Sequence, residues 1–208
     1  MAKKNKGFTL WFTGLPCSGK STLAEMVAKE LEQRGRLVDI LDGDVVRTHL
    51  TKGLGFSKDD RDTNIRRIGY VCGLISKHGG VAISAAISPY RAIRDEVRAS
   101  ISQNSTFVEV FVNTPLEECI KRDVKGMYKK ALAGEMRDFT GVDAPYEAPE
   151  NAELTIETVQ ETPAQSAARI LTKLEQMALV DPPQDKGYTP EEAEKIHKRL
   201  EKLGYIEG

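Results

Sequence analysis

One stretch of the chain constrains its fold more than any other, because it places a loop motif between a strand pattern and a helix pattern. The apolar run Phe8 to Thr13 is typical of a buried strand, and residues 21–34 carry apolar side chains at helical spacing before Gly35. Between them, Gly14-Leu15-Pro16-Cys17-Ser18-Gly19-Lys20-Ser21 matches GxxxxGK[ST]. A glycine-rich turn that matched the motif by chance would not be expected to follow a strand pattern and precede a helix pattern. The sequence therefore predicts a phosphate-binding loop, or P-loop.

The residue types in this loop suit the phosphates of a nucleotide. Glycines let backbone N–H groups turn inward to phosphate distance, where side chains would collide with the ligand. The following helix adds partial positive charge at its N-terminus, Lys20 can reach the outer phosphates, and the Ser21 hydroxyl can coordinate Mg²⁺. Cys17 is expected to contribute backbone geometry. We expect ATP rather than GTP, because no NKxD-type guanine-reading segment is visible.

Five short apolar runs alternate with segments of helical character. The runs cover residues 8–13, 37–41, 80–87, 107–113 and 153–157, and further helices are expected at 64–77 and 165–179. This alternation predicts an α/β fold in three layers, with a mainly parallel five-stranded sheet covered by helices on both faces. Such sheets bind ligands beyond the carboxyl ends of their strands, so functional residues should follow the runs.

Charge and cysteine content narrow the function classes. The formal net charge of −1 provides no overall field for nucleic acid or an anionic membrane, so any anion site must be local. No apolar stretch approaches the ~18 residues of a spanning helix. The three cysteines are far apart and show no CxxC spacing, which indicates neither a disulfide framework nor a zinc site and favours a reducing cytoplasm. Cys72 and Cys119 are expected to be core residues.

Two carboxylates follow the second apolar run, in Asp42-Gly43-Asp44. Phosphoryl transfer to a hydroxyl needs one group that supports magnesium and another that accepts the hydroxyl proton. We assign Asp44 as the base and Asp42 as the magnesium support, although the two roles could be reversed. The structural alternative is a turn in which an aspartate caps a helix that begins near Val45.

Arginines are dense after the same run, and they indicate an anionic substrate. Guanidinium groups bind phosphate or sulfate oxygens with two parallel hydrogen bonds. Each arginine alone would be interpreted as a solvated surface residue. The set comprises Arg47, Arg61, Arg66, Arg67 and Arg91, with Asn64 among them.

The later part of the chain divides into a polar segment, a closing helix and an extension. Residues 121–150 are too polar for a core and are interpreted as a functional lid or a disordered loop. We expect one domain over residues 1–180 and a helical extension over 181–208. In the extension, Thr189-Pro190-Glu191-Glu192 is typical of a capped helix start and Gly204 of a helix end.

Taken in order, these motifs resemble the adenylyl-sulfate (APS) kinase family over about residues 7–179. The ordered set is far more specific than the loop motif alone. It comprises GLPCSGKST at 14–22, DGDVVR at 42–47, FS at 56–57, DR at 60–61, NIRR at 64–67, ISPYR at 87–91, KGMYKKA at 125–131, DFTG at 138–141 and YEAPE at 146–150.

The resemblance implies a reaction, a fold and an assembly. The reaction is transfer of the γ-phosphoryl group of ATP to the 3′-hydroxyl of adenosine 5′-phosphosulfate (APS), which gives PAPS and ADP in sulfate activation. The fold is that of P-loop kinases, with a five-stranded parallel sheet and a lid. The assembly is usually a homodimer, and the substrates are small molecules, ATP with Mg²⁺ and APS.

The resemblance also assigns residues to roles. Catalytic roles fall to Lys20, Asp42, Asp44 and Ser88, and the metal to Ser21 and Asp42. ATP contacts fall to Gly14, Leu15, Pro16, Cys17, Ser18, Gly19, Lys20, Ser21, Thr22 and Arg122. APS contacts fall to Asp44, Arg47, Phe56, Arg61, Asn64, Ile87, Ser88, Lys125, Phe139 and Thr140, with Phe56 and Phe139 on either side of the adenine. Without the resemblance, both phenylalanines would be interpreted as loop-anchoring core residues.

Two points stay open at this stage. In bacterial members of the family, the serine that matches Ser88 is regarded as a phosphoserine intermediate, whereas we prefer substrate binding by the Ile87 and Ser88 backbone, because no base besides Asp44 is evident. The rival functions are another small-molecule P-loop kinase, for a nucleoside or a sugar acid, and a nucleotide-binding regulatory domain without catalysis. The intact Lys20, Ser21 and Asp44 argue against the second rival.

Overall fold

The computed structural model describes residues 6–183, 194, 195 and 198. Lys3, Lys4 and most of the helix expected at 189–204 lie outside this described part. Within it, five strands form one sheet in the order β2-β3-β1-β4-β5, and every neighbouring pair is parallel. The strands are β1 (Phe8–Thr13), β2 (Val38–Asp42), β3 (Val81–Ala85), β4 (Thr106–Asn113) and β5 (Leu154–Glu157). The predicted fold class is confirmed.

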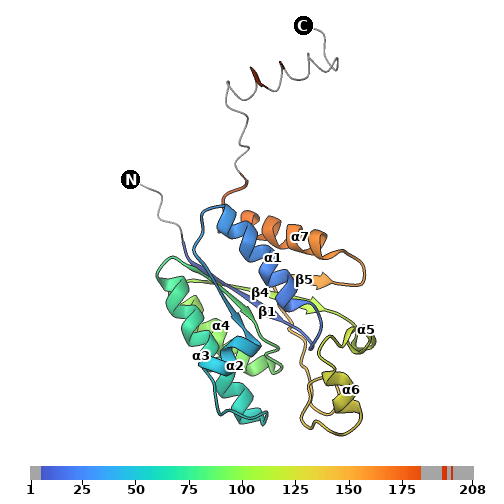
Figure 1. Cartoon of the computed structure of the whole chain (residues 1–208). Helices are drawn as coiled ribbons and strands as arrows, with labels where there is room; N and C mark the ends of the chain where they lie inside the picture. The colour runs from blue at the N-terminus through green and yellow to red at the C-terminus, as the bar shows by residue number, and fades with distance from the viewer. Residues whose placement is uncertain (1–5, 184–193, 196–197, 199–208) are drawn as a thin grey trace.

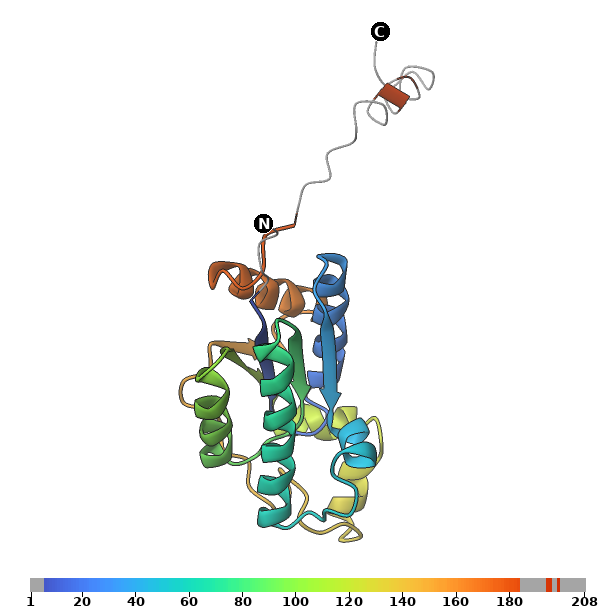
Figure 2. The same ribbon diagram turned by 90° about the vertical axis from the view of Figure 1, so that its left-hand side faces the viewer.

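Helices cover both faces of the sheet. Figure 1 shows α1 and α7 on one face and α3 and α4 on the other, while Figure 2 shows α3 and α4 side by side. The short helices α5 and α6 lie beyond the carboxyl ends of the strands. The helices are α1 (Lys20–Gln33), α2 (Gly43–His49), α3 (Lys58–Lys77), α4 (Arg91–Ser102), α5 (Leu116–Arg122), α6 (Met127–Leu132) and α7 (Pro163–Gln176).

The central strand β1 supplies both main cores. Side chains alternate between the two faces of a strand, so Leu10 and Phe12 pack under α1 and α7 while Trp11 packs under α3 and α4. The first core also takes in Leu179 and Val180 beyond the end of α7. Burial of all six residues of β1 fits a central parallel strand with helices on both sides.

A third, smaller core joins the polar segment 121–150 to the P-loop. Tyr128 and Phe139 are buried there with Cys119, and their rings meet edge to face at 4.9 Å. Burial raises the pKa of the Cys119 thiol and raises that of Cys72 to about 12, so both cysteines are core residues as expected.

Helix α3 begins six residues before the expected start. Ser57 caps it, because its Oγ accepts a hydrogen bond from the Asp60 amide at 3.2 Å, and two aspartates follow in the first turn. The polar sequence after Ser57 conceals this turn from an argument based on apolar spacing. Among the residues that the structure describes, no helix combines the length and the apolar character needed to cross a bilayer.

Candidate active site

The P-loop follows β1 and enters α1 through a backbone that requires glycine. Gly14 has φ 150°, and a Cβ there would approach the Val112 carbonyl oxygen to 2.6 Å. Gly19 caps α1 with φ 109°, a value that side chains other than hydrogen rarely allow. Cys17 also has a positive φ of 60°, in agreement with a contribution through backbone geometry.

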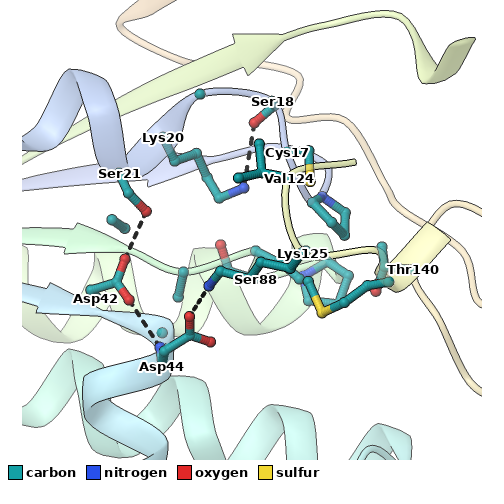
Figure 3. A pocket seen from close by; sticks show the side chains of 18 of the residues that line it. Cys17, Ser18, Lys20, Ser21, Asp42, Asp44, Ser88, Val124, Lys125 and Thr140 are labelled. Carbon is teal, nitrogen blue, oxygen red and sulfur yellow. Dashed lines mark hydrogen bonds and ion pairs between the residues drawn. The ribbon is translucent and has the colours of Figure 1, made fainter. Parts of the chain in front are cut away.

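Lys20 is buried inside this loop. Its ammonium group donates hydrogen bonds to the carbonyl oxygens of Gly14 at 3.0 Å and Leu15 at 2.7 Å. It also donates to the Ser18 hydroxyl at 3.4 Å (Figure 3). Burial lowers the pKa of Lys20 from 10.5 to about 8. A phosphate group beside the loop would favour the charged form again. Binding of an anion beside the loop should therefore raise the pKa of the Lys20 amine.

Ser21 and Asp42 bring two oxygen donors together next to the loop. The Ser21 hydroxyl donates to Asp42 Oδ2 at 2.7 Å, and the other oxygen of Asp42 accepts from the Asp44 amide at 3.0 Å (Figure 3). Asp42 thus caps α2, as the structural alternative for this turn required, and still presents an oxygen to Ser21. Hydroxyl and carboxylate oxygens are the ligands that Mg²⁺ prefers, with phosphates completing its shell. The pair fits a magnesium ion that arrives with a nucleotide.

Asp44 and Lys125 face each other across the site. Asp44 lies in the first turn of α2, Lys125 lies between α5 and α6, and the ammonium group donates to Asp44 Oδ2 (Figure 3). This hydrogen bond raises the pKa of Lys125. Both side chains are more than half exposed, at 57% for Lys125 and 70% for Asp44, so the contact can open when a ligand competes for it.

A cavity of about 710 Å³ connects the P-loop with these carboxylates and continues to the polar segment. Its volume lies in the range typical of ligand pockets. All site residues that the family resemblance assigned, except Gly14 and Leu15, line it. They are Pro16, Cys17, Ser18, Gly19, Lys20, Ser21, Thr22, Asp42, Asp44, Arg47, Phe56, Arg61, Asn64, Ile87, Ser88, Arg122, Lys125, Phe139 and Thr140.

One end of the cavity combines aromatic rings with guanidinium groups. Phe56 is 55% exposed, and the guanidinium carbons of Arg47 and Arg61 lie 4.4 and 5.8 Å from its ring centre. Arg61 also donates to the Phe56 carbonyl and to Thr140 Oγ1, each at 2.7 Å. Phe139 lines the same end but is 8% exposed, so it serves the third core as well.

Only two of the five dense arginines reach the cavity. On α3, Arg61 and Asn64 are three residues apart and share the buried face, whereas helical geometry turns Arg66 outward. Arg66 pairs with Glu96 at 2.7 and 2.8 Å, and Arg67 donates to the Leu50 carbonyl at 3.3 Å. Arg91 binds the segment that ends in Glu150. The prediction from proximity in sequence therefore included three arginines that do not line the cavity.

Ser88 is buried, and its hydroxyl is fully engaged. Ser88 Oγ accepts from Trp11 Nε1 at 3.1 Å and donates to Thr13 Oγ1 at 3.2 Å, and the residue is 1% exposed with φ 43°. A nucleophile needs a free oxygen next to a base, and none of these partners is one. The geometry favours a backbone role at the cavity wall.

Sequence reasoning missed the cavity wall formed after β5. Thr158, Glu161, Pro163 and Ser166 line it there, and Arg122 from α5 reaches Thr158 Oγ1 at 3.3 Å and the Ser18 carbonyl at 3.1 Å. The end of the fifth apolar run was a usable signal, because all carboxyl ends of a parallel sheet share one edge. Since β2 and β5 are the two outer strands, this wall and the carboxylates flank the P-loop on opposite sides.

A parallel sheet with a P-loop after its central strand, and carboxylates after an outer strand, defines a phosphotransferase of the P-loop kinase class. The family model described as adenylylsulphate kinase matches residues 6–157, which is most of the chain. The chain belongs to the adenylyl-sulfate kinase family.

Individual relatives agree with this assignment. The chain is 53% identical over 180 residues to the adenylyl-sulfate kinase of Rippkaea orientalis, across 86% of this chain and 98% of that one. It is 59% identical over 174 residues to a probable bifunctional SAT/APS kinase of Sorangium cellulosum, across 84% of this chain but 29% of that longer protein. The APS kinase of Mycobacterium tuberculosis, solved in complex with AMPPNP and APS, is 41% identical with a TM-score of 0.77, across 82% and 98% of the two chains.

Proposed function

We propose that this chain transfers the γ-phosphoryl group of ATP to the 3′-hydroxyl of APS and releases PAPS and ADP. The observation that carries the proposal is the single cavity, in which a P-loop, a carboxylate pair and an aromatic end with two arginines are continuous. Family membership and the relative solved with AMPPNP and APS support the same pair of substrates.

ATP binds with its phosphates on the P-loop and its base toward the wall after β5. Backbone N–H groups and the start of α1 hold the β- and γ-phosphates, and Lys20 neutralises charge on them. Ser21 and Asp42 would hold Mg²⁺, which would neutralise part of the phosphate charge when bound. Arg122 lies between Ser18 and Thr158, where it can cover the nucleotide.

APS occupies the opposite end, where its adenine stacks on Phe56 and Phe139. Base stacking on aromatic rings is tolerant of sequence and substantial. Arg47, Arg61 and Asn64 bind the phosphosulfate and ribose, because guanidinium groups match the geometry of such oxyanions. These contacts give a planar, anionic acceptor a site that a nucleoside or sugar-acid kinase would not need.

Asp44 is the catalytic base for the transfer. The 3′-oxygen of APS forms the new bond to the γ-phosphorus while the bond to the leaving ADP oxygen breaks, and the hydroxyl proton passes to the Asp44 carboxylate. Lys125 moves from Asp44 to the substrate anion and, with Thr140, closes the cavity. Closure excludes water and so limits wasteful ATP hydrolysis.

We further propose a homodimer in a reducing cytoplasm, with residues 181–208 as an extension of the kinase domain. The dimer rests on the family resemblance. The compartment rests on three free, separated cysteines. Sedimentation of the purified chain tests the dimer.

A coupled assay of ADP release with APS and Mg-ATP tests the proposed reaction. We expect turnover that depends on APS, with PAPS as the product by anion-exchange chromatography. AMP, which lacks the sulfate, and gluconate, a sugar acid, serve as control acceptors and should give little turnover. Equal turnover without APS, or a preference for either control acceptor, would remove the proposed function.

A further inference from the structure

A buried arginine lies behind the part of the cavity wall formed by Ile87 and Ser88. Arg94, on α4, is 1% exposed. Its guanidinium group donates to the Ser88 carbonyl at 2.6 Å, to the Glu147 carbonyl at 2.6 Å and to Glu109 Oε1 at 3.0 Å. A buried charge is costly unless its partners satisfy it, and here three separate segments do so. One of these three acceptors is the carbonyl of a residue in the cavity wall, Ser88.

That wall residue has a backbone conformation that its own chemistry does not favour. Ser88 has φ 43°, in the left-handed region that residues with a Cβ seldom adopt, so its surroundings must hold it there. Trp11 holds the side chain, since its indole N–H donates to Ser88 Oγ at 3.1 Å. Arg94 holds the carbonyl. Together, the two contacts fix the side chain and the backbone carbonyl of Ser88.

The same arginine also secures the segment that returns from the lid to β5. Besides the Arg94 contact at Glu147, the Glu147 amide donates to the Pro89 carbonyl at 2.8 Å. The Tyr146 hydroxyl is hydrogen-bonded to Thr13 Oγ1 at 2.9 Å, and Thr13 in turn donates to the Ile87 carbonyl at 2.9 Å. The wall at 87–89 and the return segment at 146–147 therefore behave as one unit.

We propose that Arg94 and Trp11 are positioning residues for the sulfonucleotide acceptor. They hold the Ile87–Ser88 backbone in the conformation that faces the cavity, and Arg94 fixes the lid's return segment against it. This inference rests on the proposed function. Neither Arg94 nor Trp11 lines the cavity, so both act through Ser88 rather than by touching APS. Loss of the Arg94 or Trp11 contacts should therefore weaken the binding of APS and not that of ATP, because other contacts support the P-loop.

The test compares Arg94→Lys with Arg98→Lys in the full chain. Arg98 belongs to the same charge network, where it pairs with Glu109 at 3.0 Å and Glu153 at 2.6 Å, and these contacts reach neither Ser88 nor Glu147. Lysine keeps the charge and cannot span three acceptors. Arg94→Lys should raise KM for APS roughly tenfold or more, as expected when a hydrogen bond from a charged group is lost, with KM for ATP unchanged. Arg98→Lys should change neither constant.

Trp11→Phe provides a second variant in case Arg94→Lys does not fold. It removes the N–H donor and keeps an aromatic ring, so KM for APS should rise about two- to tenfold, as for one neutral hydrogen bond. Phe107→Leu is the control, because Phe107 stacks on Trp11 in the same core at 5.7 Å and its ring has no donor for the Ser88 hydroxyl. An unchanged KM for APS in Trp11→Phe overturns the proposal, as does an equal rise in KM for ATP.

Hydrogen exchange separates this inference from the proposed reaction. In Arg94→Lys, the amides of residues 86–90 and 145–149 should exchange faster than in wild type, whereas Arg98→Lys should leave them protected. This readout needs no turnover, so it stands even if the wild type does not use APS. Unaltered exchange in both segments of a folded Arg94→Lys variant would overturn the proposed role.

Discussion

At the scale of single residues, Lys20 couples nucleotide binding to pH. Its pKa is about 8 in the free protein because of burial, and phosphates should raise it in the complex. Binding must then take up a proton above about pH 8, so affinity for Mg-ATP should fall by up to roughly tenfold per pH unit from there and stay level below about pH 7. Calorimetry in buffers of different ionisation enthalpy measures the uptake. Lys20→Arg should abolish it, and affinity that is constant to about pH 9.5 would contradict the assignment.

Phe56 offers a test of the acceptor end. If the adenine of APS stacks on this ring, Phe56→Ala should weaken the binding free energy of APS by about 1–3 kcal/mol. This corresponds to a rise in KM for APS of roughly 5- to 150-fold. The melting temperature should hardly change, because the ring is 55% exposed. Phe139→Leu should instead lower stability, since that ring packs on Tyr128 in the third core. An unchanged KM for APS in Phe56→Ala would place the adenine elsewhere.

Residue types in a motif could be predicted, while the direction of each side chain could not. Lys20 and Ser21 are placed by the backbone that the motif fixes, and Asp42 meets Ser21 from the end of β2. Arg61 and Arg66 are five residues apart on one helix, and only the first reaches the cavity, which depends on where α3 begins and how it packs. The buried position of the Ser88 hydroxyl depends on Trp11, 77 residues away in the sequence.

At the scale of elements, the segment proposed as a lid, residues 121–150, has both buried anchors and exposed side chains. Tyr128 is buried, and its hydroxyl donates to the Pro16 carbonyl at 3.1 Å, which fixes α6 to the P-loop. Asp123 accepts from the amides of Tyr128 and Lys129 at 2.9 and 3.0 Å. Lys125 stands between these anchors with its side chain 57% exposed. Substrate contact at Lys125 can therefore change without unfolding the segment.

Lys125→Ala should consequently affect kinetics far more than stability. The exposed ion pair with Asp44 is worth about 0–1 kcal/mol, so unfolding should change little. We expect a higher KM for APS and a larger share of ATP hydrolysed without transfer, because closure over the anion is lost. The ratio of PAPS formed to ADP released measures this share. Lys129→Ala, at an exposed position on α6, is the control, and an equal ratio in both variants would contradict the lid role.

Strands were predicted within two residues of their ends because parallel strands are continuous apolar runs. Short or polar elements were not resolved in this way. Helix α6 has six residues and depends on the amide hydrogen bonds that Asp123 accepts and on buried Tyr128. A period of 3.6 residues cannot be recognised over so short a span. The lid was accordingly expected as one polar segment, whereas it contains the end of α5, α6 and a bridge between Thr140 and Ala144.

At the scale of the whole molecule, strand order places the parts of the cavity relative to one another. The order β2-β3-β1-β4-β5 puts the P-loop at the centre, the carboxylates on one side and Thr158 on the other. Alternating strands and helices predicted the parallel sheet, but not this order, because each crossover can return on either side of the preceding strand. The end of the fifth apolar run could have indicated the cavity wall after β5, but only the strand order places that wall and the carboxylates on opposite sides of the P-loop.

The kinase domain should end between Leu179 and Pro183. Leu179 and Val180 are buried in the first core, and Arg36 donates to the Leu179 carbonyl at 2.6 Å. A chain that stops after Pro183 should therefore keep activity, melting temperature and sedimentation. A chain that stops after Gln176 lacks the buried side chains of Leu179 and Val180. Its free energy of unfolding should be lower by about 1.5–3 kcal/mol for each of them. A change in activity or assembly in the chain that stops after Pro183 would assign a function to residues 184–208.

The most direct test of the account is the turnover of Asp44→Asn with saturating APS and Mg-ATP. Asparagine keeps the shape but cannot accept the hydroxyl proton, so kcat should fall by about 10²- to 10⁴-fold. Affinity for Mg-ATP, measured by calorimetry, should stay close to that of the wild type, because the P-loop is intact. A near-normal kcat in this variant would show that another group takes the proton and would contradict the assignment of Asp44 as the base.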